Sequence, residues 1–545
     1  MNERDFAPAA TPRDFAVVAR EFAPVAALLL LGAFAFIHLL AVPPFEDEGT
    51  QLRLIYRVID AGEWLQPLTE GKPLEAWPMV PLAMLAARPL AAIRALHVLL
   101  GMVAAVLTYA LARQVTDRRT ALASGVLFAT CPFVVYLQRF AHSDILMCTA
   151  GVWVLLATLR LIRSPTWPGA TSLAVALVLA ALSKLPVGFV FLMSMPLALV
   201  LMPAPERRRL LQPPALTRVI VAHVPVLLLA VAVTAVVVVR TQRGQLAGFG
   251  VQDLIGIGLG RYHDIGAASG VTRPSLIGEL TAQLSWPVVG LGLIGLVASA
   301  LLNDWRQRWL IIVGGAPLLA IGSLTAFWFS RYLLFALPPL IVAAASGWRS
   351  LSSRVPGHSR AVGLAVFAVS VGLMLQQSMR LVLDPLTARW SPLDRSQYFE
   401  GVGSGYGYPE AAQFLLKSAD APQMIYSLDG HSAYQLRSYL PATWRNRVQP
   451  VFYGEDGQML RGGEARLGQL LRHTPAWIVV SEQLLPRYLQ SEFGESALEQ
   501  IHVRKIATFD KPGGRTQLAL YEVTPRQPEA QVYPRGVVLS RMNGC

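Results

Sequence analysis

Long apolar segments recur through the first 381 of the 545 residues, and they constrain the fold more than any other feature of the sequence. A helix needs about 20 apolar residues to cross the hydrocarbon core of a bilayer. Hydrophobic residues make up 54% of the chain and charged residues only 15%, which is typical of an integral membrane protein. We predict a polytopic α-helical membrane protein with about eleven transmembrane helices, at residues 22–42, 89–112, 119–137, 143–162, 169–183, 185–203, 218–240, 284–302, 309–329, 332–347 and 361–381.

Residues 74–87 are also apolar, but they are short and are interrupted by Pro78 and Pro81. Proline removes a backbone donor and breaks a helix interior. We therefore interpret this segment as a re-entrant or interfacial helix, and a twelfth span is the alternative.

The basic residues predict the orientation. The formal net charge is +13, and Lys and Arg lie between apolar spans rather than in one patch, which favours inside loops over nucleic-acid binding. A cytoplasmic N-terminus puts every strongly basic short loop inside: Arg113, Arg118 and Arg119; Arg160 and Arg163; Arg207, Arg208, Arg209 and Arg218; Arg306 and Arg308; Arg349, Arg354 and Arg360. The same orientation places Asp47, Lys72, Asp144 and the loop 241–283 outside.

The chain changes character after residue 381, and we divide it into a transmembrane domain (1–381) and a polar domain (382–545). An odd number of spans puts this second domain outside. Its pattern alternates helices with strands, which predicts a C-terminal α/β extracytoplasmic domain. The expected helices are 409–419, 432–439, 465–471 and 484–500, and the expected strands are 424–428, 448–453, 476–480 and 517–523.

Acids and a lysine gather near one predicted membrane surface. Residues 52–59 carry apolar side chains at helical spacing, which predicts an amphipathic helix lying on the membrane, with Asp47 and Glu48 at its start. Each charge also has a structural interpretation: Asp47 and Asp144 suit helix caps, and Lys72 suits a lysine at the interface. Charges are expensive in a bilayer, so their gathering favours a functional site.

Several motifs occur in an order that resembles the GT-C superfamily of membrane glycosyltransferases, above all protein O-mannosyltransferases (glycosyltransferase family 39) and lipid A aminoarabinose transferase. The resemblance rests on the following residues: Asp47-Glu48, Gly62-Glu63-Trp64, Gly71-Lys72-Pro73-Leu74 with Trp77, Ala141-His142-Ser143-Asp144, Leu182-Ser183-Lys184 with Gly188, Arg331-Tyr332 with Pro338, and the stretch Asp394 to Gly407. The sequence departs from the family pattern twice, because Lys72-Pro73-Leu74 lacks a second proline and Leu185 stands where a glycine follows the lysine.

The resemblance implies an inverting enzyme that moves a sugar from a polyprenyl-phosphate donor to an acceptor hydroxyl of a lipid, glycan or protein at the outer face of the plasma (inner) membrane. It assigns Asp47 as the base, Glu48 as an assisting or orienting acid, and Asp144 as an acid that holds the acceptor or positions a cation. Lys72, Lys184, Arg331 and Tyr332 are the expected donor-phosphate group. No cofactor is certain, and a divalent cation stays open.

The loop 241–283 is long and irregular, which favours a lid, and Arg261, His263 and Glu279 are its candidate acceptor or lid residues. Arg94 and His97 lie inside an apolar span, where buried pairing or a groove contact is expected rather than catalysis. A transporter or flippase of lipid-linked sugars is the alternative function, although repeated halves are not evident. A transferase of another group, such as phosphoethanolamine, and a membrane-anchored binding protein are further alternatives. The sequence does not identify the sugar, the acceptor or the lipid length.

Overall fold

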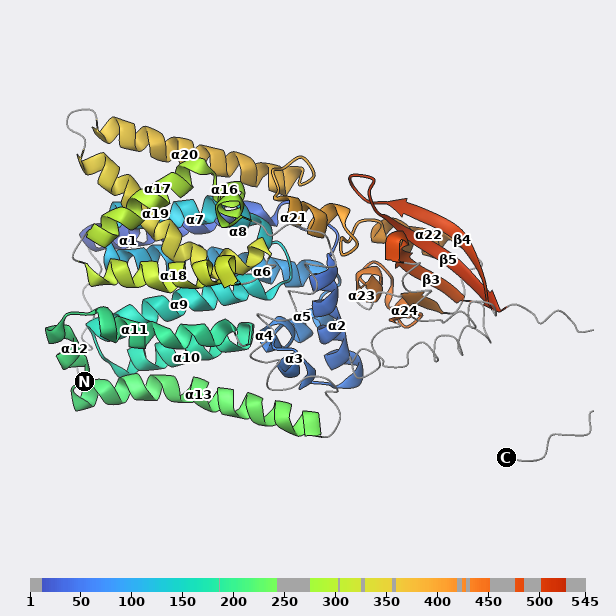
Figure 1. Cartoon of the computed structure of the whole chain (residues 1–545), viewed down its shortest axis with the longest axis horizontal. Coiled ribbons are helices and arrows are strands. Elements are labelled where there is room, and N and C mark those ends of the chain that lie inside the picture. The colour runs from blue at the N-terminus through green and yellow to red at the C-terminus, as the bar shows by residue number, and fades with distance from the viewer. Residues whose placement is uncertain are drawn as a thin grey trace, which may run out of the picture. The chain divides into compact units, whose positions relative to one another are not determined.

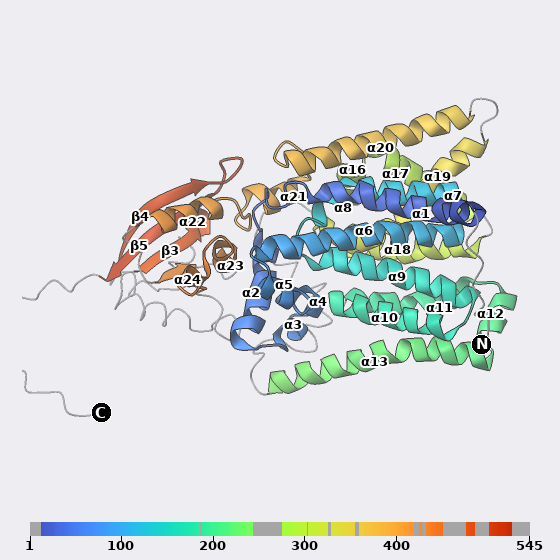
Figure 2. The ribbon, with the colours of Figure 1, turned by 180° about the vertical axis from the view of Figure 1, so that it is seen from behind.

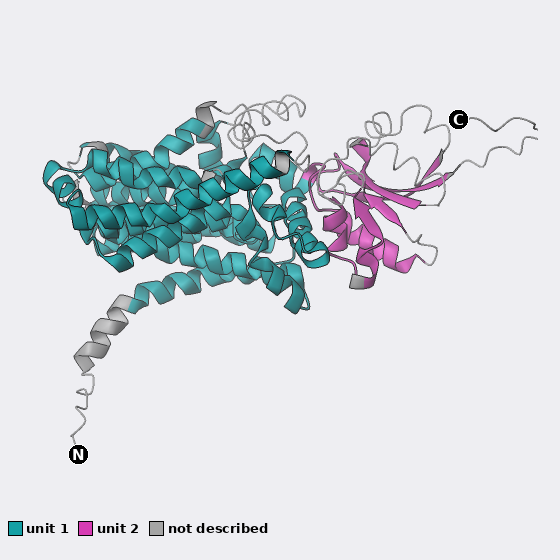
Figure 3. Ribbon diagram, turned by 90° about the horizontal axis from the view of Figure 1, so that it is seen from below, with its two compact units in different colours: residues 1–399 teal, residues 400–545 magenta. Residues whose placement is uncertain are grey.

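A computed structural model describes residues 12–185, 187–242, 275–301, 304–324, 329–354, 359–418, 424–427, 432–450, 476–484 and 501–525. The chain forms two compact units, Met1–Phe399 and Glu400–Cys545 (Figure 3). The predicted boundary near residue 381 instead lies close to the end of the last long helix of the first unit.

The first unit is a bundle of helices (Figure 1). Its elements are α1 (Pro12–Ala33), η1 (Phe34–Phe36), α2 (Glu46–Ala61), α3 (Gln66–Thr69), α4 (Pro73–Ala76), α5 (Met79–Leu85), α6 (Pro89–Val115), α7 (Arg118–Thr130), α8 (Pro132–Leu137), α9 (Ser143–Arg163), α10 (Trp167–Ser183), η2 (Val187–Met193), α11 (Ser194–Leu201), α12 (Ala204–Leu210), α13 (Pro213–Gln242), α16 (Leu276–Leu284), α17 (Trp286–Leu301), α18 (Trp305–Leu324), η3 (Ser330–Ala336), α19 (Leu337–Arg354), α20 (Ser359–Leu383), α21 (Pro392–Arg395) and η4 (Ser396–Glu400).

Within the described residues each predicted span is largely helical, but residues 37–42 form turns and bends, and several spans are broken. Among the described residues, five helices are long and apolar enough to cross a membrane, and a pair bent by 116° at Ser285 would make a sixth. The predicted span 119–137, for example, is divided into α7 and α8, because Pro132 lacks the backbone donor that would continue α7. The protein is therefore a multi-pass membrane protein, while the number eleven remains a prediction.

Helix α9 lies in the centre of the bundle, between α6 and α10. Within its most apolar stretch, 83% of the residues are buried. Glycines allow close approach around it: a Cβ on Gly151 would lie 2.3 Å from the Phe191 ring, and one on Gly188 would lie 2.0 Å from the Ala180 carbonyl oxygen. The turn after α10 is therefore packed tightly, and this turn carries Lys184.

Helices α2 to α5 gather at one end of the bundle (Figure 2). Leu52, Ile55 and Tyr56 are buried, as the apolar periodicity predicts. Arg53 and Arg57 are buried as well, because they pair with Glu70 and Glu63 at 2.5 and 2.7 Å. Helix α2 thus has the predicted apolar face, but its arginines are also covered, and its position on the membrane stays a prediction.

The second unit contains one five-stranded sheet in the order β2-β1-β3-β5-β4. Its strands are β1 (Ile425–Ser427), β2 (Val448–Pro450), β3 (Ala476–Ser481), β4 (Ile501–Asp510) and β5 (Gln517–Pro525), and its helices are α22 (Tyr408–Lys417), α23 (Ser432–Arg437) and α24 (Ala442–Arg445). Strand β1 runs parallel to β2 and β3, whereas β5 runs antiparallel to β3 and β4.

The sequence pattern missed strand β4. Its charged residues His502, Arg504 and Lys505 conceal the alternation, and β4 is an edge strand, where exposed charges are common. The expected helices 465–471 and 484–500 lie outside the described residues, apart from Leu484.

Candidate functional site

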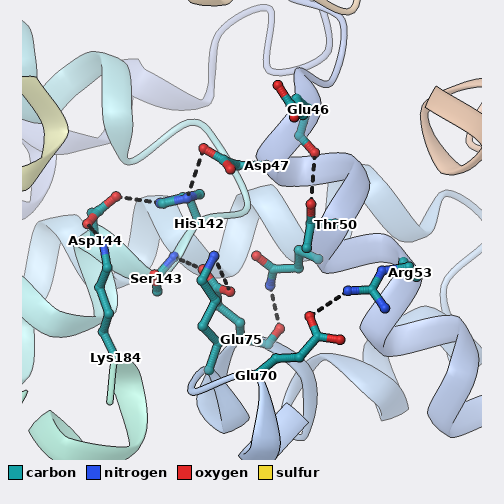
Figure 4. A network of polar contacts seen from close by, with 12 residues as sticks. Glu46, Asp47, Thr50, Arg53, Glu70, Glu75, His142, Ser143, Asp144 and Lys184 are labelled. Carbon is teal, nitrogen blue, oxygen red and sulfur yellow. Dashed lines mark hydrogen bonds and ion pairs between the residues drawn. The ribbon is translucent and has the colours of Figure 1, made fainter. Parts of the chain in front are cut away.

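Asp47 is held at the start of α2 by cationic partners. Phe45 occupies the cap position of α2, has an extended backbone and makes no side-chain cap. Asp47 is the second residue of the helix. Its Oδ2 lies 2.7 Å from Arg331 Nη2. The same oxygen lies 3.6 Å from His142 Nε2 (Figure 4). The Asp47 side chain is 25% exposed. The capping interpretation of Asp47 is therefore wrong, and the carboxylate stays accessible.

Asp144 is the second acid of this end of the bundle, and it too does not cap its helix. His142 occupies the cap position of α9. Asp144 Oδ1 lies 2.8 Å from Lys184 Nζ, and Asp144 Oδ2 lies 2.5 Å from His142 Nδ1 and 3.8 Å from Arg331 Nε. Arg331 and His142 thus each face both acids. The His142 side chain makes no capping bond to the start of α9.

The charges of this cluster determine the protonation of Asp47. Burial alone would raise the pKa of the Asp47 carboxyl, but Arg331 and then His142 lower that pKa well below its ordinary value. Burial would lower the pKa of Lys72, but Glu75 and Asp47 raise that pKa above its ordinary value. Asp47 is therefore ionised and Lys72 is charged at neutral pH.

Lys72 lies near Asp47 and Asp144 and pairs with Glu75, an acid that the sequence analysis missed. Lys72 Nζ lies 3.6 Å from Glu75 Oε2, and Glu75 is 1% exposed. The Glu75 carboxylate also accepts a hydrogen bond from the Ser143 backbone N–H, at the start of α9. The spacing of three residues between Lys72 and Glu75 was the available signal. Glu75 thus links α4 to the helix that carries Asp144.

Glu48, predicted as an assisting or orienting acid, is fully buried. Its carboxylate forms a double contact with Arg94, at 2.9 Å to Nε and 2.5 Å to Nη2, and accepts from the Ala141 backbone N–H at 2.7 Å. Arg94 also donates to the carbonyls of Leu39 and Val42. Glu48 therefore suits the positioning of α2, and its contacts confirm buried pairing for Arg94. His97 is buried beside its own helix, 2.8 Å from the Ile93 carbonyl oxygen.

Aromatic rings surround the cations. Lys184 Nζ lies 4.5 Å from the centre of the Tyr332 ring, and Arg331 Cζ lies 4.1 Å from the centre of the Phe329 ring. Arg331 Nη1 also donates to Gln397 Oε1 at 2.5 Å. Such contacts orient a guanidinium without neutralising it. Gln397 comes from the segment after α20, which the sequence analysis quoted only as part of a family resemblance.

The first loop and the Lys184 turn are joined through the backbone. Gly71 has φ +76°, a region that favours glycine, and its carbonyl accepts from Leu185 N at 2.7 Å. A Cβ on Gly71 would lie 3.0 Å from the Leu185 carbonyl oxygen. The close approach at this junction is thus provided by Gly71, so Leu185 is tolerated where the family pattern has glycine.

The lid candidates are only partly visible. Arg261 and His263 lie outside the described residues. Glu279 lies in α16 and is buried, near Asp394, which accepts from Gln283 Nε2 at 2.7 Å and from Ser330 Oγ at 2.6 Å. Within the part of the chain that the structure describes, Glu279 lies near Asp394 and Ser391 and not near Asp47 or Asp144, so it belongs to a second group that ties α16 to the segment after α20.

The carboxylates of the cluster face protein cations rather than a cavity suited to a metal. Among the described residues, no three His, Cys, Asp or Glu side chains are arranged to hold a metal ion. Asp47 and Asp144 contact Arg331, Lys184 and His142, which a divalent cation would have to displace. In this arrangement the donor set does not fit a metal.

The sequence and the fold both resemble known glycosyltransferases. A sequence profile described as dolichyl-phosphate-mannose-protein mannosyltransferase matches residues 69–239. No curated protein matches by sequence. Among solved structures, ArnT from Cupriavidus metallidurans bound to undecaprenyl phosphate has a TM-score of 0.58 at 16% identity and covers 94% of this chain and 98% of its own.

An archaeal enzyme has a similar fold. The Archaeoglobus fulgidus oligosaccharyltransferase in complex with Zn and sulfate has a TM-score of 0.56 at 12% identity, over 91% of this chain and 73% of its own. At such identities the likeness concerns the fold, and the profile match adds the resemblance in sequence. The chain is a multi-pass membrane protein with the fold of the GT-C glycosyltransferase superfamily, and it resembles protein O-mannosyltransferases and ArnT.

Proposed function

We propose that the protein is an inverting glycosyltransferase that moves a sugar from a polyprenyl-phosphate donor to an acceptor hydroxyl at the outer face of the inner membrane. The observation that carries this proposal is the setting of Asp47. Its carboxylate is ionised and 25% exposed, whereas Glu48 and Glu75 are buried against their partners. Asp47 is thus the acid of this group best placed to reach a bound acceptor.

The reaction follows from these charges. A hydroxyl is a weak nucleophile, so Asp47 accepts its proton while the hydroxyl oxygen bonds to the anomeric carbon. The bond from that carbon to the phosphate oxygen breaks, and the lipid phosphate leaves with the electron pair. Attack from the face opposite the leaving group inverts the anomeric centre. The leaving phosphate is an anion, so it requires cations more than a proton.

Lys72, Lys184 and Arg331 are the cations that we assign to the donor phosphate. All three lie around Asp47 and Asp144, and Lys72 and Lys184 keep side-chain exposures of 23% and 17%. Tyr332 orients Lys184 through its ring. Charge-assisted hydrogen bonds from such groups are well suited to phosphate oxygens. A solved structure of ArnT with undecaprenyl phosphate supports a donor of this class.

The membrane orientation completes the proposal. The basic residues Arg207, Arg208 and Arg209 are exposed on α12, as expected of an inside loop. With the N-terminus cytoplasmic, the Asp47 cluster and the second unit are extracytoplasmic. We assign the second unit a role in acceptor choice.

Purified protein tests the reaction directly. It is incubated with a panel of synthetic polyprenyl-phosphate hexoses and pentoses and an envelope lipid extract as acceptor. We expect release of polyprenyl phosphate, and a product whose anomeric configuration in NMR is opposite to that of the donor. Retention of configuration would overturn the mechanism. Movement of intact donor between the leaflets of a vesicle, without cleavage, would identify a flippase instead.

A deletion strain identifies the acceptor. Mass spectrometry of its envelope lipids and glycans should show one glycoconjugate that lacks a single sugar, while the polyprenyl-phosphate donor accumulates. Complementation with the unchanged gene should restore the sugar, and complementation with Asp47→Asn should not. An envelope identical to that of the parent strain would contradict the proposal.

A further inference from the structure

His142 lies between the two acids of the candidate site. It precedes α9 in an extended conformation and is 3% exposed. Its Nδ1 lies 2.5 Å from Asp144 Oδ2, and its Nε2 lies 3.6 Å from Asp47 Oδ2 (Figure 4). The Phe45 ring lies beside the imidazole, with ring centres 6.0 Å apart. A single buried ring thus has each nitrogen close to a different carboxylate.

The protonation state of the imidazole decides whether it can donate a hydrogen bond to both carboxylates. A neutral ring carries one N–H and one lone pair, so it can donate to only one acid. The lone pair would then face the other carboxylate, which is repulsive. A protonated ring donates from both nitrogens and places a positive charge between two negative ones. The position of His142 therefore favours the imidazolium.

We propose that His142 is a positioning residue of the transfer reaction: its imidazolium bridges Asp144 to Asp47 and fixes the carboxylate that receives the acceptor proton. This inference rests on the proposed function. Arg331 and His142 both make their closest approach to the same oxygen of Asp47, Oδ2. Two cationic groups at one oxygen favour one orientation of the carboxylate and leave Oδ1 to the acceptor hydroxyl.

The groups around His142 balance its charge. The acids around it are Asp47 and Glu48 on α2, Glu75 on α4 and Asp144 on α9. The cations are Lys72 at the start of α4, Arg94 on α6, Lys184 after α10 and Arg331 on η3. His97 on α6 and Tyr398 on η4 are the other titratable groups. Lys72, Lys184 and Arg331 each lie close to an acid, so they do not prevent protonation of the ring.

The net effect on His142 gives the direction of the pH dependence. Burial lowers the pKa of His142, but Asp144 and Asp47 together raise that pKa above its ordinary value. The raised pKa means that the bridge is present below the pKa of free histidine and is lost as pH rises through the folded value. Turnover should therefore decline at high pH with the loss of one proton.

The first test needs no substrate. The protein is labelled with ¹⁵N-histidine in detergent, and the ring nitrogens are titrated by NMR, with His142 assigned by its absence in His142→Gln. We expect a pKa above the ordinary value of about 6.5 and a decrease of at least about one unit in Asp144→Asn. A His142 that titrates at or below the ordinary value, or that does not respond to Asp144→Asn, would overturn the bridge.

The second test measures turnover of the synthetic polyprenyl-phosphate sugar that the wild type accepts. We expect His142→Gln to reduce kcat by about 10-fold to 100-fold, as for a misplaced catalytic group, with KM for the donor within about twofold. The decline at high pH should disappear in this variant and should move to lower pH in Asp144→Asn. A decline that persists unchanged in His142→Gln would refute the inference.

The matched control is His223→Gln. His223 lies on α13, where its Nδ1 is 2.8 Å from the Val219 carbonyl oxygen of its own helix. This variant should keep the wild-type kcat and pH profile. The two proposals fail separately: a wild type that transfers no sugar refutes the proposed function, whereas normal transfer with an unchanged profile in His142→Gln refutes only the role of His142.

Discussion

At the scale of residues, burial divides the acids of the candidate site into two roles. Glu48 and Glu75 have exposures of 0% and 1% and accept from backbone N–H groups, so they fix the positions of chain segments. Asp47 keeps a quarter of its side chain exposed and is held by side chains alone. An acid without exposure cannot reach an acceptor, so exposure supports the proposal of Asp47 as the base beside the family resemblance.

Asp47→Asn should reduce turnover by about 10²- to 10⁴-fold, the usual contribution of proton transfer to a positioned base. An amide keeps the shape of the side chain but cannot accept a proton. The measurement is kcat in purified protein, with thermal unfolding to show that the variant is folded. Asp60→Asn is the control, because Asp60 is an exposed acid of the same helix. A variant that keeps more than about a tenth of wild-type turnover would exclude Asp47 as the base.

Arg94→Met should destabilise the protein by about 3–5 kcal/mol, because it leaves the Glu48 carboxylate buried without a charge partner. Glu48→Met in the same chain should recover part of this loss, since two apolar side chains leave no buried charge. Thermal and denaturant unfolding in detergent measure both effects. If Arg94→Met and the double variant are equally stable, the unpaired Glu48 carboxylate is not what destabilises Arg94→Met.

Asp47, Lys72 and Asp144 could be singled out from the sequence pattern and Lys184 and Arg331 from the family resemblance, but their pairing could not be predicted. Asp47, Asp144, Lys72, Lys184 and Arg331 lie at the ends of apolar segments, where a charge is conspicuous, and the structure brings all five together. Their partners Glu75 and Gln397 lie in segments without any such contrast. The contact between Gln397 and Arg331 joins residues 66 positions apart, which no local pattern reveals.

At the scale of elements, the positions of helices followed the apolar pattern, whereas their breaks and their burial did not. Residues 185–203 form η2 and α11, and residues 332–347 begin in η3, because local packing changes the helix type. Helix α2 has the periodicity of a surface helix, yet it is buried, because Glu63 and Glu70 neutralise its arginines from the following loop. Tertiary pairing of this kind overrides an amphipathic pattern.

Gly71→Ala tests the junction between the first loop and the Lys184 turn. Gly71 and Gly62 both have positive φ, +76° and +68°, so alanine has a similar backbone cost of about 1–2 kcal/mol at either position. Only at Gly71 would the new Cβ meet a neighbour, the Leu185 carbonyl oxygen at 3.0 Å. The displaced turn carries Lys184, so KM for the donor should rise by at least about fivefold in Gly71→Ala.

Gly62→Ala is the matched control, because nothing lies within 4 Å of its added Cβ. It should lower the melting temperature by a similar amount and leave the donor KM unchanged. Equal changes in donor KM for the two variants would show that the junction with Leu185 does not position the donor cations.

At the scale of the whole molecule, the orientation in the membrane decides the meaning of every site residue. With the N-terminus cytoplasmic, a reporter fused after Arg209 should be active in the cytoplasm, and a reporter fused after Leu440 should be active outside. Alkaline phosphatase and green fluorescent protein fusions at both positions measure this, each serving as the control for the other. The opposite pattern would place the Asp47 cluster in the cytoplasm.

The division into two units places the end of the first unit later than the apolar pattern does. The apolar pattern ends near residue 381, but Asp394 contacts Ser330 and Gln283, and Gln397 contacts Arg331. The segment 384–399 therefore belongs to the first unit by its contacts, although it is as polar as the second. Composition alone places the boundary too early. It shows where the apolar segments end, whereas residues beyond them still pack against the first unit.

Two chimeras with a relative that uses a different acceptor separate these boundaries. The relative should lack an acid and an amide at the positions of Asp394 and Gln397. A chimera joined after Phe399 keeps both residues, so it should retain donor preference and most of the turnover while its acceptor preference shifts toward the relative. A chimera joined after Leu381 loses the contacts to Ser330 and Arg331 and should lose turnover, and restoring Asp394 and Gln397 in it should recover part of that loss. Competition assays with two donors and two acceptors measure both preferences; a donor preference that follows the second unit would refute this division of roles.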